Sequence, residues 1–175
     1  MSKAKCSALS YTSTDAPIAG QLWLATTEQG LCAIAFDGDE ASFVARLQRR
    51  WGVQPQRDDS VLAAAITQVR EYLSGRRTVF DLPLDLRLLR PFHRLALQAT
   101  AAIPWGQVST YRALAHEIGR PRAVRAMGRA EARNPLPLVI PCHRVIGSNG
   151  NLTGYSGGLE MKSALLQLEG VMLRV

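Results

Sequence analysis

Three closely spaced prolines, Pro135, Pro137 and Pro141, constrain this chain more than any other feature of its sequence. Each proline fixes its own φ and pushes the preceding residue into an extended conformation, so the stretch is not expected to form a helix. Cys142 and His143 follow Pro141 directly. The prolines therefore predict a thiol and an imidazole on backbone that is held to one narrow path.

Cys142 is a candidate nucleophile. A thiol attacks as the thiolate, and its pKa falls from about 8.5 when an imidazole or a helix N-terminus lies close. Because consecutive side chains of an extended segment point to opposite faces, His143 can act through water or a third group rather than by direct contact. The alternative is a buried structural cysteine, the commoner state of an intracellular cysteine.

The composition indicates a globular protein with one sizeable core or two small domains, since 47% of the 175 residues are hydrophobic. The three cysteines, Cys6, Cys32 and Cys142, have no short spacing, which argues against a disulfide framework and a zinc knuckle. A metal site that includes Cys6 is the alternative, but no ligand pair stands at i, i+3 or i, i+4 to support it. We expect no metal.

The sequence also argues against a membrane protein. No apolar stretch approaches the roughly 20 residues of a membrane span, and no signal-type apolar block follows the N-terminus. We expect a cytoplasmic protein.

The net charge of +7 is concentrated in the second half of the chain. Residues 91–175 hold ten Lys and Arg against four Asp and Glu, whereas residues 1–90 hold eleven against ten. Between residues 109 and 147 all basic residues are arginines, which suit bidentate phosphate contact and insertion between stacked bases. This predicts nucleic-acid binding; the alternative is a solvated, soluble helix face.

The first half is expected to be a small α/β module. Residues 21–36 alternate apolar and polar side chains around a turn, which predicts a hairpin. Apolar residues at helical spacing predict helices over residues 40–51 and 60–73, the second ending at Gly75. Residues 80–86 alternate like a strand.

The second half is expected to be mainly helical. Pro91 opens one helix, which runs through Ile103 and is ended by Pro104-Trp105-Gly106. Ser109 or Thr110 caps the next helix, which ends at Gly119. A further helix over residues 122–133 completes a helix-turn-helix pattern. Steps of three or four residues keep its four arginines, Arg122, Arg125, Arg129 and Arg133, on one side. Geometry and charge together favour nucleic acid, although the pattern alone also fits any helical hairpin.

The end of the chain adds a turn, a glycine-rich loop and a helix. Residues 147–151 form the turn, and residues 153–158 form a loop with an aromatic face and several backbone donors. The last helix, residues 159–169, ends at Gly170. Its terminal Glu169 opposes the helix dipole by roughly 0.3–1 kcal/mol, which is better explained if it meets a cation or an imidazole such as His143.

Taken together, these motifs resemble the O6-alkylguanine-DNA alkyltransferases. The resemblance rests on Asn134-Pro135, on Pro141 to Val145, on the arginine-bearing helix-turn-helix and on Gly154-Tyr155-Ser156-Gly157-Gly158. It extends from about Phe92 to Gly170, whereas the first half matches in size and in its two-strand start. The resemblance implies an α/β fold: an N-terminal α/β, ribonuclease H-like domain over residues 1–88, and over residues 89–175 a mainly helical alkyltransferase domain with a winged helix-turn-helix-like motif.

The implied activity is direct repair of DNA. The protein would transfer an alkyl group from O6-alkylguanine in double-stranded DNA to its own Cys142, once per molecule and without a cofactor. The target base would be flipped out of the duplex, which the protein would bind mainly through the minor groove as a monomer. O4-alkylthymine is a second candidate substrate, and the monomer is also a candidate for cooperative assembly on DNA.

The resemblance also assigns residues. His143 would act as base through water, Glu169 would orient it, Tyr111 would donate a proton to the leaving guanine, and Asn134 would hold the site together. Binding of the base would fall to Val145, Tyr155, Ser156 and Gly157, with Gly157 and Gly158 hinting at room for groups larger than methyl. DNA contacts would come from Arg125, which fills the gap left by the flipped base, and from Ser109, Thr110, Arg122, Ala123, Ala126, Gly128, Arg129 and Ser148.

Two residues depart from the family pattern. Arg129 stands where a small residue is usual, which would add a phosphate contact or lift the helix slightly. Glu131 stands at an often apolar position close to the base pocket, where its charge would alter the pocket or face water.

Three other functions compete with DNA repair: a lesion-binding relative without transfer, a helix-turn-helix regulator and a thiol hydrolase. The presence of Cys142 argues against a lesion-binding relative, which lacks the acceptor cysteine. The absence of a cysteine cluster argues against the regulator, and the arginine helix argues against the hydrolase, which would not need it.

Overall fold

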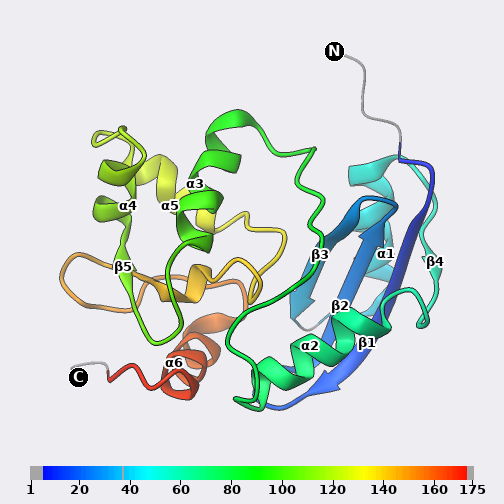
Figure 1. The fold of residues 1–175 in the computed structure, drawn as a ribbon. Helices are drawn as coiled ribbons and strands as arrows, with labels where there is room; N and C mark the ends of the chain where they lie inside the picture. The colour runs from blue at the N-terminus through cyan, green and yellow to red at the C-terminus, as the bar shows by residue number, and fades with distance from the viewer. Residues whose placement is uncertain (1–5, 37, 173–175) are drawn as a thin grey trace. The chain divides into compact units, whose positions relative to one another are not determined.

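The computed structural model describes residues 6–36 and 38–172, and it divides into two compact units, Met1–Leu88 and Leu89–Val175. The predicted class is confirmed: the first unit is built on a sheet and the second is mainly helical (Figure 1). In the described residues, no helix combines the length and apolar character needed to cross a membrane.

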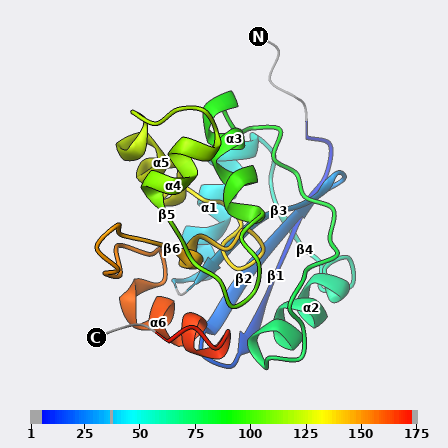
Figure 2. The same cartoon turned by 60° about the vertical axis from the view of Figure 1, so that its left-hand side comes forward.

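The first unit is a four-stranded sheet with one helix on each face (Figures 1 and 2). The strand order is β3-β2-β1-β4, with the first two neighbouring pairs antiparallel and β1-β4 parallel. The strands are β1 (Leu9–Ala16), β2 (Gly20–Thr27), β3 (Gly30–Phe36) and β4 (Gln56–Arg57), and the helices are α1 (Glu40–Trp51) and α2 (Ala63–Leu73).

Alternation along the strands separates the two faces of this sheet. Tyr11 and Trp23 face α1, where Trp23 stacks on Phe43 with ring centroids 5.8 Å apart. Thr14 of β1 lies on the opposite face of the sheet, where Arg70 of α2 donates to its hydroxyl at 2.9 Å. The unit therefore has an aromatic core under α1 and a mixed layer under α2.

The hairpin prediction for residues 21–36 is confirmed by β2 and β3, and the predicted first helix has the observed bounds of α1. Strand β1 lay outside the prediction, because its sequence is rich in Ser and Thr and lacks a clear apolar alternation. The prediction of a strand over residues 80–86 is wrong. Pro83 has no N–H to donate, and an isolated bridge between Leu31 and Leu84 is what forms there.

The second unit packs three helices around a small apolar core. Its buried members include Ala96, Leu114, Met127 and Val145, so α3, α4, α5 and the strand after the cysteine segment all contribute. The elements are α3 (Pro91–Ala101), β5 (Ser109–Thr110), α4 (Tyr111–Glu117), α5 (Val124–Glu131), the 3₁₀ turn η1 (Cys142–Arg144), β6 (Val145–Ile146) and α6 (Gly158–Leu168).

The helix-turn-helix prediction agrees with α4 and α5. Thr110 is the N-cap of α4 and accepts from the backbone N–H of Ala113, while Gly119 ends the segment with φ of 68°. Helix α5 is shorter than predicted, because Arg122 lies in the preceding turn and Arg133 lies beyond the last helical residue. Strands β5 and β6 pair in parallel and bring the start of α4 beside the residues that follow Cys142.

Candidate active site

Cys142 lies at the start of a 3₁₀ turn, so the prediction of an extended conformation at this residue is wrong. The backbone before it turns sharply: Leu138 adopts a positive φ of 76°, and the N–H of Ile140 donates to the carbonyl of Leu136 at 2.8 Å. The prolines still exclude an α-helix, but a short turn satisfies their restrictions. Buried Leu136, Leu138 and Ile140 anchor this path.

Asn134 holds the cysteine segment through three hydrogen bonds. Its Nδ2 donates to the carbonyl of Ile140 at 2.8 Å and to Cys142 Sγ at 3.1 Å. Its Oδ1 accepts from the N–H of Leu136 at 3.0 Å. One amide side chain therefore spans the turn and fixes the position of the sulfur.

The Cys142 thiol is 5% exposed, and burial raises its pKa to about 12, against the lowering effect of the Asn134 hydrogen bond. Desolvation disfavours the thiolate more than one neutral donor favours it. The resting group is therefore the thiol, and a nucleophilic reaction needs a nearby base to take its proton.

His143, Arg144 and Glu169 form a buried ionic cluster. The Nε2 of His143 lies 2.8 Å from Glu169 Oε1. Arg144 donates to both carboxylate oxygens, from Nε at 2.9 Å and from Nη2 at 3.0 Å, and also to the carbonyl of Ile103. The N–H of Gly106 adds a weaker contact to Glu169 at 3.3 Å. The expected pairing of Glu169 with His143 is confirmed, and Arg144 is a partner that the sequence did not indicate.

This cluster sets the state of the imidazole. Burial lowers the pKa of His143, more than the hydrogen bond with Glu169 raises it, so the ring is neutral at pH 7. With a carboxylate at Nε2, that nitrogen carries the proton and donates, which leaves the lone pair on Nδ1. Arg144 is 6% exposed and neutralises the buried carboxylate, so it does not belong to the exposed arginines considered for phosphate contact.

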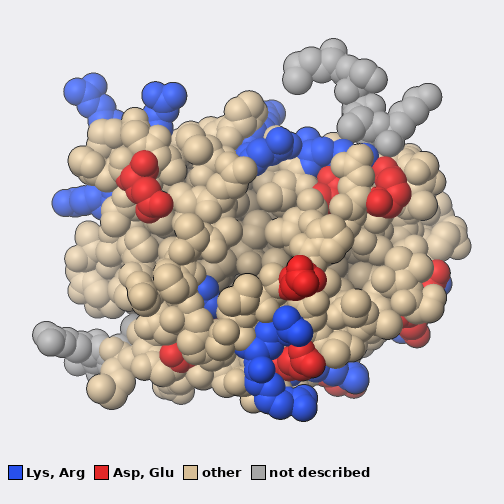
Figure 3. All heavy atoms as spheres, in the orientation of Figure 1, with Lys and Arg blue, Asp and Glu red and all other residues tan. Residues whose placement is uncertain are grey.

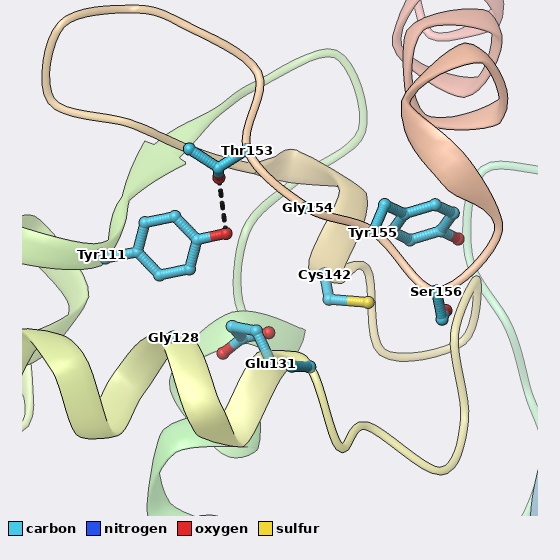
Figure 4. A pocket seen from close by; sticks show the side chains of 9 residues that line it. Tyr111, Gly128, Glu131, Cys142, Thr153, Gly154, Tyr155 and Ser156 are labelled. Atoms are coloured by element: carbon cyan, nitrogen blue, oxygen red, sulfur yellow. Dashed lines mark hydrogen bonds between the residues drawn. The ribbon is translucent and has the colours of Figure 1, made fainter.

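A cavity of about 470 Å³ opens beside the sulfur (Figure 4). Its walls come from α4, α5, the cysteine turn and the loop before α6, and Figure 4 shows Cys142 between Glu131 and Tyr155. The lining residues are Tyr111, Gly128, Glu131, Ala132, Cys142, Thr153, Gly154, Tyr155 and Ser156. A volume in this range is typical of small-molecule sites and is large enough for one nucleobase.

Tyr111 lies across this cavity, where its hydroxyl is 2.8 Å from Thr153 Oγ1. Burial raises the pKa of Tyr111, so the phenol keeps its proton at neutral pH and is available as a donor. The structure thus brings together Cys142, Tyr111, Tyr155 and Ser156. Gly157 does not line the cavity and is the N-cap of α6.

Lys162 is a buried residue of the site that the sequence did not indicate. Its Nζ donates to the carbonyl of Val145 at 2.6 Å and to that of Thr153 at 3.0 Å, which ties the pocket loop to β6. Val145 is fully buried and is not among the residues that line the cavity, so the contact of its carbonyl with a base stays a prediction. A lone lysine in a helix of ordinary amphipathic appearance gives no sequence signal of burial.

The sequence left open whether Glu131 alters the pocket or faces water, and the structure shows that it does not face water. It is 6% exposed at the end of α5, lines the cavity, and has Oε1 2.7 Å from the hydroxyl of Thr100. Burial raises the pKa of Glu131 to about 7. The pocket therefore contains a carboxyl group that can be neutral near physiological pH.

The predicted DNA-contact residues surround α4 and α5. Lys and Arg side chains project from the face that carries these helices (Figure 3), and Arg122, Arg125 and Arg129 are exposed. Gly128 lies against the Tyr111 ring. Ser109, Thr110, Ala123, Ala126 and Gly128 are half-buried, and Ser148 is exposed. Small residues beside exposed arginines leave room for a nucleic-acid backbone to approach this helix.

Within the described residues, no group of three or more His, Cys, Asp or Glu side chains is placed to hold a metal ion. The described cysteines, Cys6, Cys32 and Cys142, are buried free thiols.

Comparison with known sequences gives matches in both units. The family model described as "6-O-methylguanine DNA methyltransferase, ribonuclease-like domain" matches residues 9–86, and the model of the DNA binding domain of the same family matches residues 91–171. A methylated-DNA–protein-cysteine methyltransferase of Mycolicibacterium paratuberculosis is 48% identical over 107 residues, which cover 61% of this chain and 64% of that relative. The bifunctional transcriptional activator/DNA repair enzyme Ada of Escherichia coli is 36% identical over 93% of this chain and 46% of its own length. The chain thus spans less than two thirds of the length of these two relatives.

Solved structures show the same fold over most of the chain. The Mycobacterium tuberculosis OGT in complex with DNA has a TM-score of 0.80 and 36% identity, covering 91% of this chain and 92% of the other. The O6-methylguanine-DNA methyltransferase of Pyrococcus kodakaraensis has a TM-score of 0.65 and 26% identity, covering 93% of this chain and 99% of the other.

Proposed function

The chain belongs to the 6-O-methylguanine DNA methyltransferase family, and on that premise we propose that it repairs alkylated DNA by moving the alkyl group of O6-alkylguanine to its own Cys142. The observation that carries this proposal is a buried thiol at the wall of a base-sized cavity, followed in the chain by a neutral imidazole that a buried carboxylate holds. This combination supplies a nucleophile, a base and an orienting group.

The transfer is a single displacement at the alkyl carbon. The thiol proton of Cys142 passes to Nδ1 of His143 through a water molecule, and Sγ attacks the carbon. The C–O6 bond breaks with its electron pair going to oxygen, and a thioether forms. Glu169 orients the imidazole and stabilises the imidazolium that results, with Arg144 keeping the carboxylate ionised.

The leaving guanine has to gain a proton as its O6 regains carbonyl character. Tyr111 is the donor, because its hydroxyl lies in the same cavity as Cys142 and remains protonated at neutral pH. One proton passes from the thiol to His143 and another from Tyr111 to the guanine. The imidazolium then gives up its proton to solvent while the Tyr111 phenolate takes one back, which restores both groups and balances the reaction. The thioether has no leaving group comparable to guanine, so each molecule acts once.

The pocket accepts the base after it leaves the duplex. A sulfur buried inside a protein cannot approach an alkyl carbon while the nucleotide is stacked and paired, so the nucleotide has to flip out. Arg125 fills the gap in the duplex, and the other exposed arginines near α5 contact phosphates. The small residues of α5 suit approach to the minor groove, whose poor sequence code fits repair in any sequence. Tyr155 and Ser156 line the pocket over the base, with Gly157 continuing the loop into α6, and the Val145 carbonyl accepts from the amino group of the base.

We propose a cytoplasmic monomer. All the groups of the reaction come from the second unit of one chain, so no second copy has to complete the site. A free thiol that has to stay reduced until its single use suits a reducing compartment.

Intact-protein mass spectrometry after mixing the protein with a duplex that carries one O6-methylguanine tests the proposal. We expect a stoichiometric gain of one methyl group, located at Cys142 by peptide mapping. Cys142→Ser is expected to gain none, while Cys32→Ser, which removes another buried thiol, is expected to gain one. Binding of the duplex without any gain would place the protein among lesion-binding proteins, and repeated turnover would contradict a suicide reaction.

The role of Arg125 has a separate test. Arg125→Ala is expected to slow transfer from the duplex by about 10-fold or more, because the flipped state loses its substitute in the base stack. Reaction with the free base O6-benzylguanine needs no flipping and is expected to keep its rate. Equal slowing on both substrates would show that Arg125 acts on the pocket and not on the duplex.

A further inference from the structure

Glu131 is the feature of the pocket that the proposed chemistry does not use. Of the pocket residues that the structure describes, it alone carries a carboxyl group, and it shares the cavity wall with Cys142 and Tyr111 (Figure 4). Its Oε1 is 2.7 Å from Thr100 Oγ1, and its Oε2 is buried without a hydrogen-bond partner among the described residues. A carboxylate in this position would be poorly solvated and would face a sulfur that has to become negative.

The contact with Thr100 fits either state of the Glu131 carboxyl group: a hydroxyl that donates to Oε1 lowers the pKa of Glu131, whereas a hydroxyl that accepts from Glu131 requires the neutral acid. The Thr100 hydroxyl lies 3.1 Å from the carbonyl of Ala96, one turn earlier in α3, and 2.7 Å from Glu131 Oε1. A hydroxyl has one proton and can donate to one of these two oxygens. When it donates to Ala96, as threonine commonly does in a helix, the contact with Glu131 needs a proton on the carboxyl group.

Few charged groups act on this carboxyl group. From α6, Lys162 lowers the pKa of Glu131 and favours the thiolate of Cys142. From α4, Tyr111 presents a neutral phenol, and from α3, Thr100 presents a neutral hydroxyl. From the cysteine turn, Cys142 presents the thiol whose pKa an ionised Glu131 raises. The field of Lys162 can therefore support the thiolate fully when Glu131 is uncharged.

We propose that Glu131 is a positioning residue for the alkyl transfer: as a neutral acid bonded to Thr100 it allows the Cys142 thiolate to form, and its ionisation slows the reaction. The coupling is reciprocal, because a charge on either group disfavours a charge on the other. Glu131 forms and breaks no bond in the reaction and acts through Cys142. The expected effect on alkyl transfer rests on the proposed function. The expected effect on ionisation of the Cys142 thiol does not, because it exists without DNA.

The first test measures the thiol alone. The rate of Cys142 alkylation by iodoacetamide is followed by peptide mass spectrometry from pH 5.5 to 9, for the parent, Glu131→Gln and Glu131→Met. Both variants are neutral at every pH. We expect them to react at the parent's rate below pH 6 and about 10-fold faster than the parent above pH 8, which corresponds to a change of about one unit in the thiol pKa. Glu160→Gln, an exposed change in α6, is the matched control and is expected to follow the parent.

The second test repeats the pH series for single-turnover transfer from a duplex with one O6-methylguanine. The ratio of the variant rate to the parent rate is expected to rise with pH across the same window. A ratio that stays constant with pH, in either series, overturns the proposal and leaves Glu131 a structural residue. Glu131→Met provides the answer if Glu131→Gln does not fold, because it fills a similar volume without a buried amide.

The two series also separate this inference from the proposed function. If the parent transfers no methyl group at any pH, the proposed function fails, and the iodoacetamide series still decides whether Glu131 controls the thiol. If the parent transfers methyl groups and the three pH profiles coincide, the proposed function stands and the inference about Glu131 fails.

Discussion

The two units bury thiols in different surroundings. Cys32, in the first unit, is 1% exposed within the aromatic core that contains Trp23 and Phe43, and burial raises its pKa. Cys142, in the second unit, is also buried and also has a raised pKa. The difference lies in the neighbours: Cys142 borders a cavity, accepts a hydrogen bond from Asn134 and precedes His143 in a tight turn. Burial alone therefore makes a thiol inert, and reactivity requires a neighbour that can take its proton.

The same contrast extends to charge. Among the acidic, basic and histidine side chains of the described residues, the first unit buries Asp85, whereas the second buries five: Glu131, His143, Arg144, Lys162 and Glu169. Buried charges contribute little net stability, and each depends strongly on its partners. The interior of the first unit is thus mainly apolar. The interior of the second unit holds several ionisable side chains beside the pocket, and their burial costs desolvation free energy.

Removing Glu169 is expected to have the largest effect on stability. Glu169→Ala leaves Arg144 and His143 buried without their carboxylate, which is expected to lower the free energy of unfolding by about 3–5 kcal/mol. Asp85→Ala in the first unit is the matched change and is expected to cost about 1–3 kcal/mol, because Arg87 keeps its hydrogen bond to Glu28. Urea denaturation, with amide hydrogen exchange to locate the loss, measures both. Equal losses would contradict the contrast between the units.

Glu131 is expected to make stability depend on pH. The pKa of Glu131 is about 7 in the folded chain, above the ordinary glutamate value of 4.5, so the folded state holds this proton more tightly. Between pH 4.5 and 7 ionisation therefore favours unfolding, and stability is lost as the pH rises through this window, by up to about 3 kcal/mol. Between pH 4.5 and 8, the difference in free energy of unfolding between Glu131→Gln and the parent is expected to shift by up to about 3 kcal/mol in favour of the variant. A difference that does not change with pH would show that the carboxyl group is ionised throughout.

Lys162 is expected to have a smaller effect that is felt at the pocket. Lys162→Met leaves the carbonyls of Val145 and Thr153 without their donor, at a cost of about 2 kcal/mol. Hydrogen exchange is expected to rise in residues 147–157, because the loop loses its tie to β6. Unchanged protection there would mean that the loop is held by other contacts, and Lys162 would then be a packing residue.

Helix caps are expected to give the smallest effects and to be equal in the two units. Asp39 caps α1 by accepting from Ser42, and Thr110 caps α4 by accepting from Ala113. Asp39→Ala and Thr110→Ala are each expected to cost about 1 kcal/mol in urea denaturation. Similar values would confine the difference between the units to their buried charges, whereas a much larger loss for Thr110 would show that local structure also differs.

Local features of the fold could be predicted from the sequence because they depend on neighbouring residues. The bounds of α1, the turn at Gly119 and the start of α3 at Pro91 follow from caps, glycines and prolines that act within one turn of chain. The strand expected over residues 80–86 failed for the converse reason. Its side chains alternate, but pairing depends on a partner strand and on Pro83, which has no N–H to donate.

The candidate nucleophile and its proposed base were likewise visible in the sequence, since Pro141-Cys142-His143-Arg144 is one continuous segment and Glu169 stands at an unfavourable helix end. The sequence alone determined which residues could react and that the arginines gather around one helix. The tertiary structure decided their states: Arg144 turned inward to Glu169, Lys162 became buried, and Glu131 entered the pocket wall beside Thr100. The physical reason is that solvation and charge coupling depend on distances between residues far apart in the chain, and these distances exist only after folding.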